Sequence, residues 1–205
     1  MKKTFFIIMM LALFVQQGIA QQDIFSAAAK GNKKLTKQLI KEGVDINDTN
    51  RLLQTPLFLA AKNEQFAIAK LLIKKGADIN KADFTGTTPL MTAVEHDNLK
   101  MIKYFLKKGA AINAVDNKGW TAIMLSKSLE ASKLLVGYGG DIKHVANNGV
   151  SALMVAAEEG NLPLCRFLIE KGANPQASDK TGLKAVDYAK KRSHQDIVDY
   201  LLSIK

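Results

Sequence analysis

The side chains best suited to catalysis or metal binding in this chain are three histidines and one cysteine. His96, His144 and His194 lie far apart in the sequence, and none belongs to an H-E-x-x-H or paired Cys/His pattern of the kind that binds zinc. Cys165 lies in the apolar phrase LPLCRFLIE, which favours a buried packing thiol over a nucleophile. No glycine-rich phosphate loop, nucleophile elbow or carboxylate pair at catalytic spacing is recognisable. The sequence therefore predicts no catalytic residue, no cofactor and no metal, and indicates a protein that is not an enzyme.

Two phrases that recur in step organise the rest of the sequence. The first phrase, KEGVDIN in its earliest form, carries a glycine column at Gly43, Gly76, Gly109, Gly139 and Gly172. The second phrase, TPLFLA in its earliest form, opens with Thr55, Thr88, Thr121, Ser151 and Lys184. Successive members of either column are 33, 33, 30 and 33 residues apart, so one repeating unit accounts for both.

The period and the TPL-x-x-A phrase resemble the ankyrin repeat, a turn followed by two antiparallel helices that buries its apolar face only against neighbouring units. The resemblance implies an all-α solenoid of about six helix-turn-helix units with short projecting turns, here called fingers. We expect one domain over residues 21–205, capped at both ends, with units at about 23–47, 48–80, 81–113, 114–143, 144–176 and 177–205.

Three features depart from the family pattern. Leu53 replaces the glycine found in the other fingers, which predicts either a strained left-handed backbone or a differently shaped finger. The fourth unit is shortened between Met124 and Leu134, which indicates either a benign loss of a surface link or a notch shaped for a partner. The family's histidine, thought to bridge units, is replaced by apolar side chains, so we expect core packing to replace that polar network. The replacing residues are Phe58, Met91, Met124 and Met154.

The first twenty residues have the composition of an export signal. Lys2 and Lys3 precede an apolar run from Phe5 to Val15, and a small-x-small cleavage site ends at Ala20. This pattern predicts a signal peptide that is removed rather than a membrane anchor, because the apolar run falls well short of the roughly 20 residues that span a bilayer. We therefore expect a periplasmic protein. Its net charge of +10, or +8 without Lys2 and Lys3, favours acidic partners, while export disfavours nucleic acid.

The resemblance also implies where a partner binds, namely on the finger tips and on the face formed by the first helix of each unit. The matching finger residues are Arg51, Leu52, Phe84, Thr85, Thr87, Asn117, Lys118, Trp120, Asn147, Asn148, Lys180 and Thr181. The matching first-helix residues include Glu95, His96, Glu158 and Glu159. We expect Phe84 and Trp120 to contribute most, because large aromatic side chains dominate protein interfaces. For Trp120, packing against the next finger is the alternative.

A basic column runs along the second helices. Its members are Lys37, Lys70, Lys103, Lys133 and Arg166, with Lys41, Lys74 and Lys107 beside them in the first three units. We expect this column to form a solvated outer side, since runs of charge are usually solvated faces. The alternative is a weak attraction to anionic envelope material.

These expectations favour a non-enzymatic, monomeric module that binds one folded exported protein. Small secreted bacterial ankyrin proteins, which this chain resembles, include self-protection and immunity proteins. The resemblance therefore implies an inhibitor that occludes an exported enzyme such as a peptidoglycan hydrolase, an endopeptidase or a toxin. The alternatives are an accessory scaffold that supports a periplasmic stress-protection enzyme, a secreted effector, and an enzyme on a solenoid frame. A repeat motif does not by itself distinguish among them.

Overall fold

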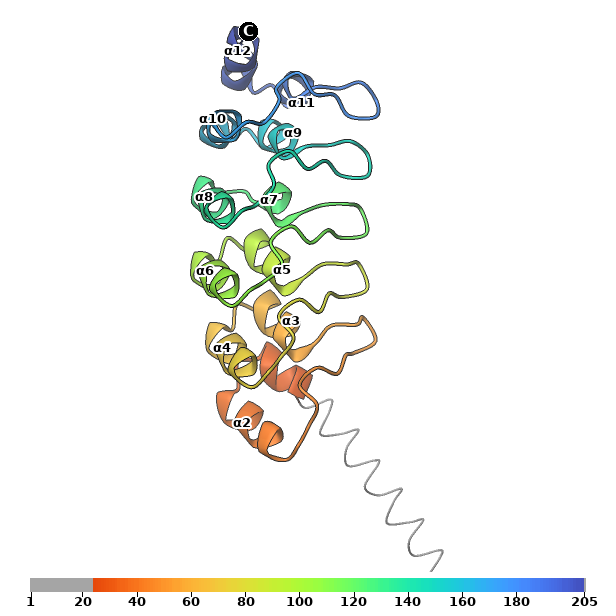
Figure 1. The fold of residues 1–205 in the computed structure, drawn as a ribbon, viewed down its shortest axis with the longest axis vertical. Coiled ribbons are helices and arrows are strands. Elements are labelled where there is room, and N and C mark those ends of the chain that lie inside the picture. The colour runs from red at the N-terminus through yellow and green to blue at the C-terminus, as the bar shows by residue number, and fades with distance from the viewer. Residues whose placement is uncertain (1–23, 205) are drawn as a thin grey trace, which may run out of the picture. The chain divides into compact units, whose positions relative to one another are not determined.

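The computed structural model describes residues 24–204, and regular structure in this range is helical apart from two isolated bridges (Figure 1). The first helices of the units are α3 (Pro56–Lys62), α5 (Pro89–Glu95), α7 (Ala122–Leu125), α9 (Ala152–Glu158) and α11 (Ala185–Lys191). The second helices are α2 (Lys33–Lys41), α4 (Phe66–Lys74), α6 (Leu99–Lys107), α8 (Leu129–Gly137), α10 (Leu162–Glu170) and α12 (Gln195–Ser203). A further helical segment covers residues 24–29. The predicted all-helical repeat architecture is confirmed, whereas the predicted signal peptide at residues 1–20 lies outside the described residues.

The chain divides into two compact units between Phe84 and Thr85. In the first unit, α4 packs against both α2 and α3. In the second unit, α5 to α12 form four successive helix pairs in which first helices pack on first helices and second helices on second helices (Figure 1). Among residues 24–204, no helix is both long enough and apolar enough to cross a membrane.

Three members of the recurring Thr/Ser column cap the first helices that follow them. The hydroxyl oxygens of Thr55, Thr88 and Ser151 accept hydrogen bonds from the backbone N–H groups of Phe58, Met91 and Met154 at 3.0, 3.2 and 3.3 Å. These bonds satisfy donors that a helix leaves unpaired in its first turn. A second capping column, which the repeat phrases did not reveal, begins four second helices through Asn32, Asn98, Ser128 and Asn161.

The four residues that replace the family's histidine fill the core. Phe58, Met91, Met124 and Met154 are all buried, with exposures of 1–3 %, so the expected apolar packing is confirmed. The Met91 and Met154 sulfurs also accept the N–H groups of Thr88 and Ser151, each at 3.4 Å. The flexible thioether therefore packs the interior and adds a weak acceptor at the helix start.

The shortening predicted in the fourth unit lies in α7, which has four residues where the other first helices have seven. After α7 the backbone is extended at Ser126. The Ser132 hydroxyl donates to the Ser126 hydroxyl at 2.9 Å, and the Ser126 hydroxyl donates to the carbonyl of Ser128 at 3.2 Å. The buried hydroxyls of Ser126 and Ser132 are therefore hydrogen-bonded in the segment that replaces the missing helical turn.

Candidate protein-binding surface

Three fingers are closed by a side-chain oxygen at their first position, which is Asn50, Asp116 or Asp179. The Asp116 carboxylate accepts the backbone N–H groups of Lys118 and Trp120, both at 2.8 Å. The Asn50 amide oxygen does the same for Leu52 and Gln54 at 2.9 and 3.0 Å. Asn and Asp favour such turns because their short side chains reach the backbone two residues further on. Hydrogen bonds within each of these fingers therefore fix its shape.

The last finger is held more strongly through Asp179. Its carboxylate accepts the Tyr188 hydroxyl at 2.6 Å, the Thr181 hydroxyl at 2.7 Å, and two backbone N–H groups. Hydrogen bonds from Tyr188 and then Thr181 favour the ionised carboxylate and hold the Asp179 pKa well below its usual range. Burial, followed by the bond to Asp179, raises the pKa of Tyr188 to about 12.

Backbone hydrogen bonds also join successive fingers. In the first compact unit the Phe84 N–H donates to the carbonyl of Leu52 at 3.1 Å. In the second, equivalent bonds of 2.9–3.0 Å join Asn117 to Thr85, Asn147 to Lys118, and Lys180 to Asn148. Within each compact unit, finger residues are thus presented from a hydrogen-bonded framework, which reduces the ordering that binding requires.

Close approach of the fingers explains the turn glycines. Gly119 has φ of +79°, and a Cβ atom there would lie 2.7 Å from the backbone nitrogen of Asn147. Gly86, at φ +80°, would place a Cβ 2.9 Å from the nitrogen of Asn117. Both positions therefore need glycine for conformation and for space. Leu53 occupies the equivalent position with φ of +55°, so of the two alternatives predicted for it the left-handed backbone is the one observed.

Three large apolar side chains are exposed at the fingers of the first compact unit. Leu52, Leu53 and Phe84 are 47 %, 51 % and 55 % exposed. The bond between Phe84 N–H and the Leu52 carbonyl places their backbones in direct contact. We call these three residues the apolar finger cluster. Leu53 was absent from the predicted binding residues, although the break that it makes in the glycine column was a visible signal.

The remaining predicted finger residues differ in exposure. Arg51, Asn117, Lys118, Asn147, Asn148, Lys180 and Thr181 are exposed, while Thr85, Thr87 and Trp120 are half-buried. The hydroxyls of Thr85 and Thr87 are 2.8 Å apart and hydrogen-bond to each other. Because Trp120 is half-buried, both of its proposed roles, in packing and in binding, remain predictions.

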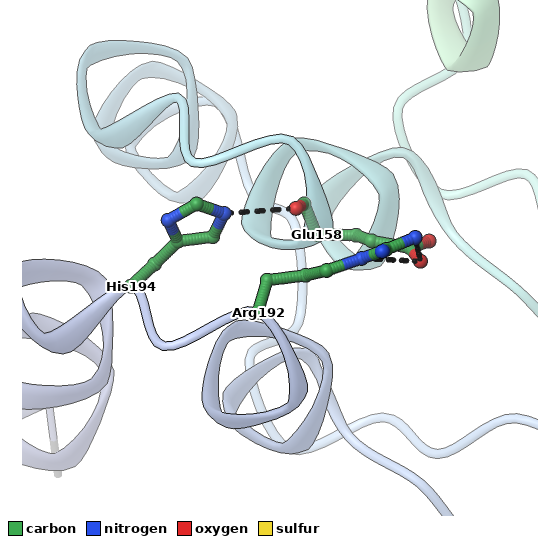
Figure 2. A network of polar contacts seen from close by, with 3 residues as sticks. All are labelled: Glu158, Arg192 and His194. Carbon is green, nitrogen blue, oxygen red and sulfur yellow. Dashed lines mark hydrogen bonds and ion pairs between the residues drawn. The ribbon is translucent and has the colours of Figure 1, made fainter.

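On the first helices, Glu158 takes part in a bridge between neighbouring helix pairs (Figure 2). Arg192 donates to its carboxylate at 2.9 and 3.3 Å, and the His194 Nε2–H donates to its backbone carbonyl at 3.0 Å. Glu95, His96 and Glu159 are exposed. The structure thus gives Glu158 a stabilising contact that the sequence did not predict.

The expectation that packing would replace polar links between units is only half right. His194 makes such a link, and His144 makes another by donating from Nε2 to the Gly119 carbonyl at 2.8 Å. Both histidines lie outside the family's usual histidine position, which is why the phrase comparison missed them. Hydrogen bonds between units are therefore made by His144 and His194, while apolar side chains, mostly methionine, occupy the family's usual histidine position.

Cys165 is fully buried, as predicted for a packing thiol. Burial, and then the nearby Asp196 charge, raise its pKa to about 12, so the thiolate is scarce at neutral pH. Within residues 24–204, no group of three or more His, Cys, Asp or Glu side chains is arranged to hold a metal ion.

Comparison with known proteins identifies the repeat. The family model described as ankyrin repeats (3 copies) matches residues 24–116, 81–144 and 120–205. A putative ankyrin repeat-containing protein of Treponema pallidum (strain Nichols) is 41 % identical over 59 residues, 29 % of this chain and 20 % of that protein. The potassium channel AKT1 of Arabidopsis thaliana is 34 % identical over 70 residues, 34 % of this chain and 8 % of the channel. The chain thus spans a small part of these relatives.

A solved structure resembles a much larger part of the chain. It is the complex of a predatory endopeptidase from Bdellovibrio bacteriovorus with an immunity protein, and the similarity is to the immunity protein. The TM-score is 0.81 with 27 % sequence identity, covering 89 % of this chain and 97 % of that one.

Proposed function

This chain belongs to the ankyrin-repeat family, and from that premise we propose that it is a non-enzymatic inhibitor of an exported enzyme, acting as an immunity or self-protection protein. Its similarity to an immunity protein that is solved in complex with an endopeptidase carries the proposal, because it extends over nearly the whole length of that protein. A peptidoglycan endopeptidase or related hydrolase is the target that this similarity favours. Inhibition by occlusion requires a complementary surface and no catalytic group.

The proposed inhibitory surface is the fingers, with the apolar finger cluster as its main contact in the first compact unit. Exposed contiguous apolar side chains are characteristic of protein-binding sites. The backbone hydrogen bond between Phe84 and Leu52 already orders the finger backbone, so binding there requires less backbone ordering. The exposed polar residues Arg51, Asn117, Lys118, Asn147 and Lys180 supply hydrogen bonds around such contacts. We propose Trp120 as an additional contact, and Glu95, His96 and Glu159 as peripheral ones.

We further propose that residues 1–20 direct export and are then cleaved off. The mature protein acts in the periplasm and binds its one folded target as a monomer. The lysine pair, apolar run and cleavage site at the start of the sequence support export. Fractionation of the producing cells and determination of the mature N-terminus test this part of the proposal. A mature chain that retains Met1 would contradict it.

Capture of the target tests the binding surface. The protein serves as bait for the exported proteins of its own host, alongside a Leu52→Ala, Phe84→Ala variant. A Tyr138→Ala, Leu202→Ala variant is the matched control, since these apolar residues are 43 % and 65 % exposed but lie outside the fingers. We expect one hydrolase to be retained by the wild-type and control proteins and lost with the finger variant. Equal retention by all three proteins would contradict the assignment of the surface.

The activity of the captured enzyme then distinguishes inhibition from support. An inhibitor lowers the rate of peptidoglycan hydrolysis in proportion to complex formed, whereas an accessory scaffold raises or preserves it. A rate unchanged by saturating protein would contradict the inhibitor proposal while leaving the binding surface intact.

A further inference from the structure

A lysine-lined groove lies between α2 and α4 in the first compact unit. It is an open depression of about 520 Å³. Lys34, Lys37 and Lys41 of α2 and Lys75 at the end of α4 line it with exposed side chains, and the half-buried Ile40 and Leu71 supply an apolar lining. Neither α2 nor α4 contains an aspartate or glutamate. We call this feature the lysine groove.

The lysine groove carries an excess of positive charge. The ion pairs of Lys171 with Glu170 and of Arg192 with Glu158 do not involve a groove lysine. Glu42, which directly follows α2 and accepts a hydrogen bond from the groove residue Gln38 at 2.9 Å, is one carboxylate against four lysines. Four ammonium groups around one depression repel one another and favour the binding of an anion.

The composition of the groove selects among anionic ligands. The lining holds lysine and no arginine, so its charges are point charges on flexible stems rather than planar forks that fix one bidentate geometry. A fully hydrated polyanion would leave Ile40 and Leu71 uncovered. A phospholipid surface supplies phosphate groups for the lysines and an apolar region for these two side chains. We propose that the lysine groove docks the protein on an anionic phospholipid membrane surface.

This docking is compatible with protein binding elsewhere. In the first compact unit, the finger lies on the side of α3 away from α2 and α4 (Figure 1). A membrane bound at the lysine groove therefore leaves the apolar finger cluster accessible. The inference concerns a different surface from the proposed inhibitory site, so either one can fail without the other.

The test is a flotation assay in which the protein, in the form that its host accumulates, is mixed with lipid vesicles. Vesicles of phosphatidylcholine with about 30 % phosphatidylglycerol are compared with vesicles of pure phosphatidylcholine, which give the charge-independent background. A lysine near an anionic membrane contributes about fivefold in partitioning. Replacing Lys34, Lys37, Lys41 and Lys75 with glutamine should therefore reduce the anionic-vesicle component by at least about 100-fold. High salt should reduce it in the wild type as well.

A matched variant separates the groove from net charge. Replacing Lys103, Lys107, Lys133 and Lys143 with glutamine removes the same charge from exposed positions of the second compact unit. We expect this variant to retain most of its binding. An equal loss in both variants, or wild-type binding that is the same on both kinds of vesicle, would overturn the proposal. Binding of an acidic peptide at the groove without binding to anionic vesicles would also overturn it.

Discussion

Replacing Leu53 with glycine should leave the protein about as stable and yet weaken its binding. Leu53 has φ of +55°, a left-handed conformation that strains an L-residue by about 1–2 kcal/mol and that glycine adopts freely. The side chain is 51 % exposed, so truncation forfeits about half of the roughly 1.5–3 kcal/mol gained by burying a leucine. Because these contributions nearly cancel, we expect the free energy of unfolding to change by no more than about 1 kcal/mol.

Denaturant unfolding followed by circular dichroism measures the stability, and calorimetric titration with the captured enzyme measures the affinity. We expect a loss of affinity of about tenfold, the size found for central interface residues. The control is Gly86→Leu, whose Cβ would lie 2.9 Å from a backbone nitrogen at φ of +80°. We expect it to destabilise the fold by more than about 2 kcal/mol. A Leu53→Gly variant destabilised as much as the control, or one with unchanged affinity, would refute this reasoning.

Further predictions concern the hydrogen bonds and the thiol. Thr88→Val should lower the unfolding free energy by about 1 kcal/mol because Thr88 caps α5. Thr121→Val should be neutral or stabilising, since the buried Thr121 hydroxyl has no hydrogen-bond partner among residues 24–204. Equal losses of stability for the two variants in denaturant unfolding would contradict both assignments. Asp179→Asn should destabilise the protein at pH 7. Because the pKa of Asp179 is depressed in the folded protein, its carboxylate contributes stability at pH values above the ordinary aspartate pKa of about 3.9, and this stability is lost as the pH falls through the folded pKa. The difference in melting temperature between variant and wild type should therefore narrow in acid. A difference that widens in acid would contradict this prediction. Cys165, with its pKa raised to about 12, should react with a maleimide only after unfolding; rapid labelling of the native protein would show that the thiol is accessible. Arg192→Ala should change stability by less than about 1 kcal/mol, because the side chains of its pair with Glu158 are 61 % and 38 % exposed.

The fold could be predicted well from the sequence because each repeat contains its own helix-capping and turn residues. Thr88 and Ser151 specify where a helix begins, and Gly119 specifies a turn that no other residue fits. These signals act within a few residues, so they can be recognised without knowing the packing. The core role of Met91 follows similarly, because a large apolar residue stands at its position in four successive units.

Contacts between repeats were harder to predict. The link from His144 to Gly119 spans 25 residues, and that from His194 to Glu158 spans 36. Histidine does not recur at either position in the other units, so only the packed structure brings the partners together. The lysine groove likewise depends on the pairing of α2 with α4, whereas the sequence indicated only a basic column. The sequence showed that Leu53 breaks the glycine column of the fingers. That its side chain is exposed beside Leu52 and Phe84 could be seen only in the folded fingers.

The central claim is that this protein inhibits an exported enzyme through its fingers. The most direct test measures peptidoglycan hydrolysis by the captured hydrolase as purified protein is added, with the wild type, the Leu52→Ala, Phe84→Ala variant and the Tyr138→Ala, Leu202→Ala control in parallel. We predict that the wild type and the control abolish hydrolysis at one equivalent, while the finger variant requires at least about tenfold more protein. Hydrolysis that continues at its full rate with saturating wild-type protein would contradict the account.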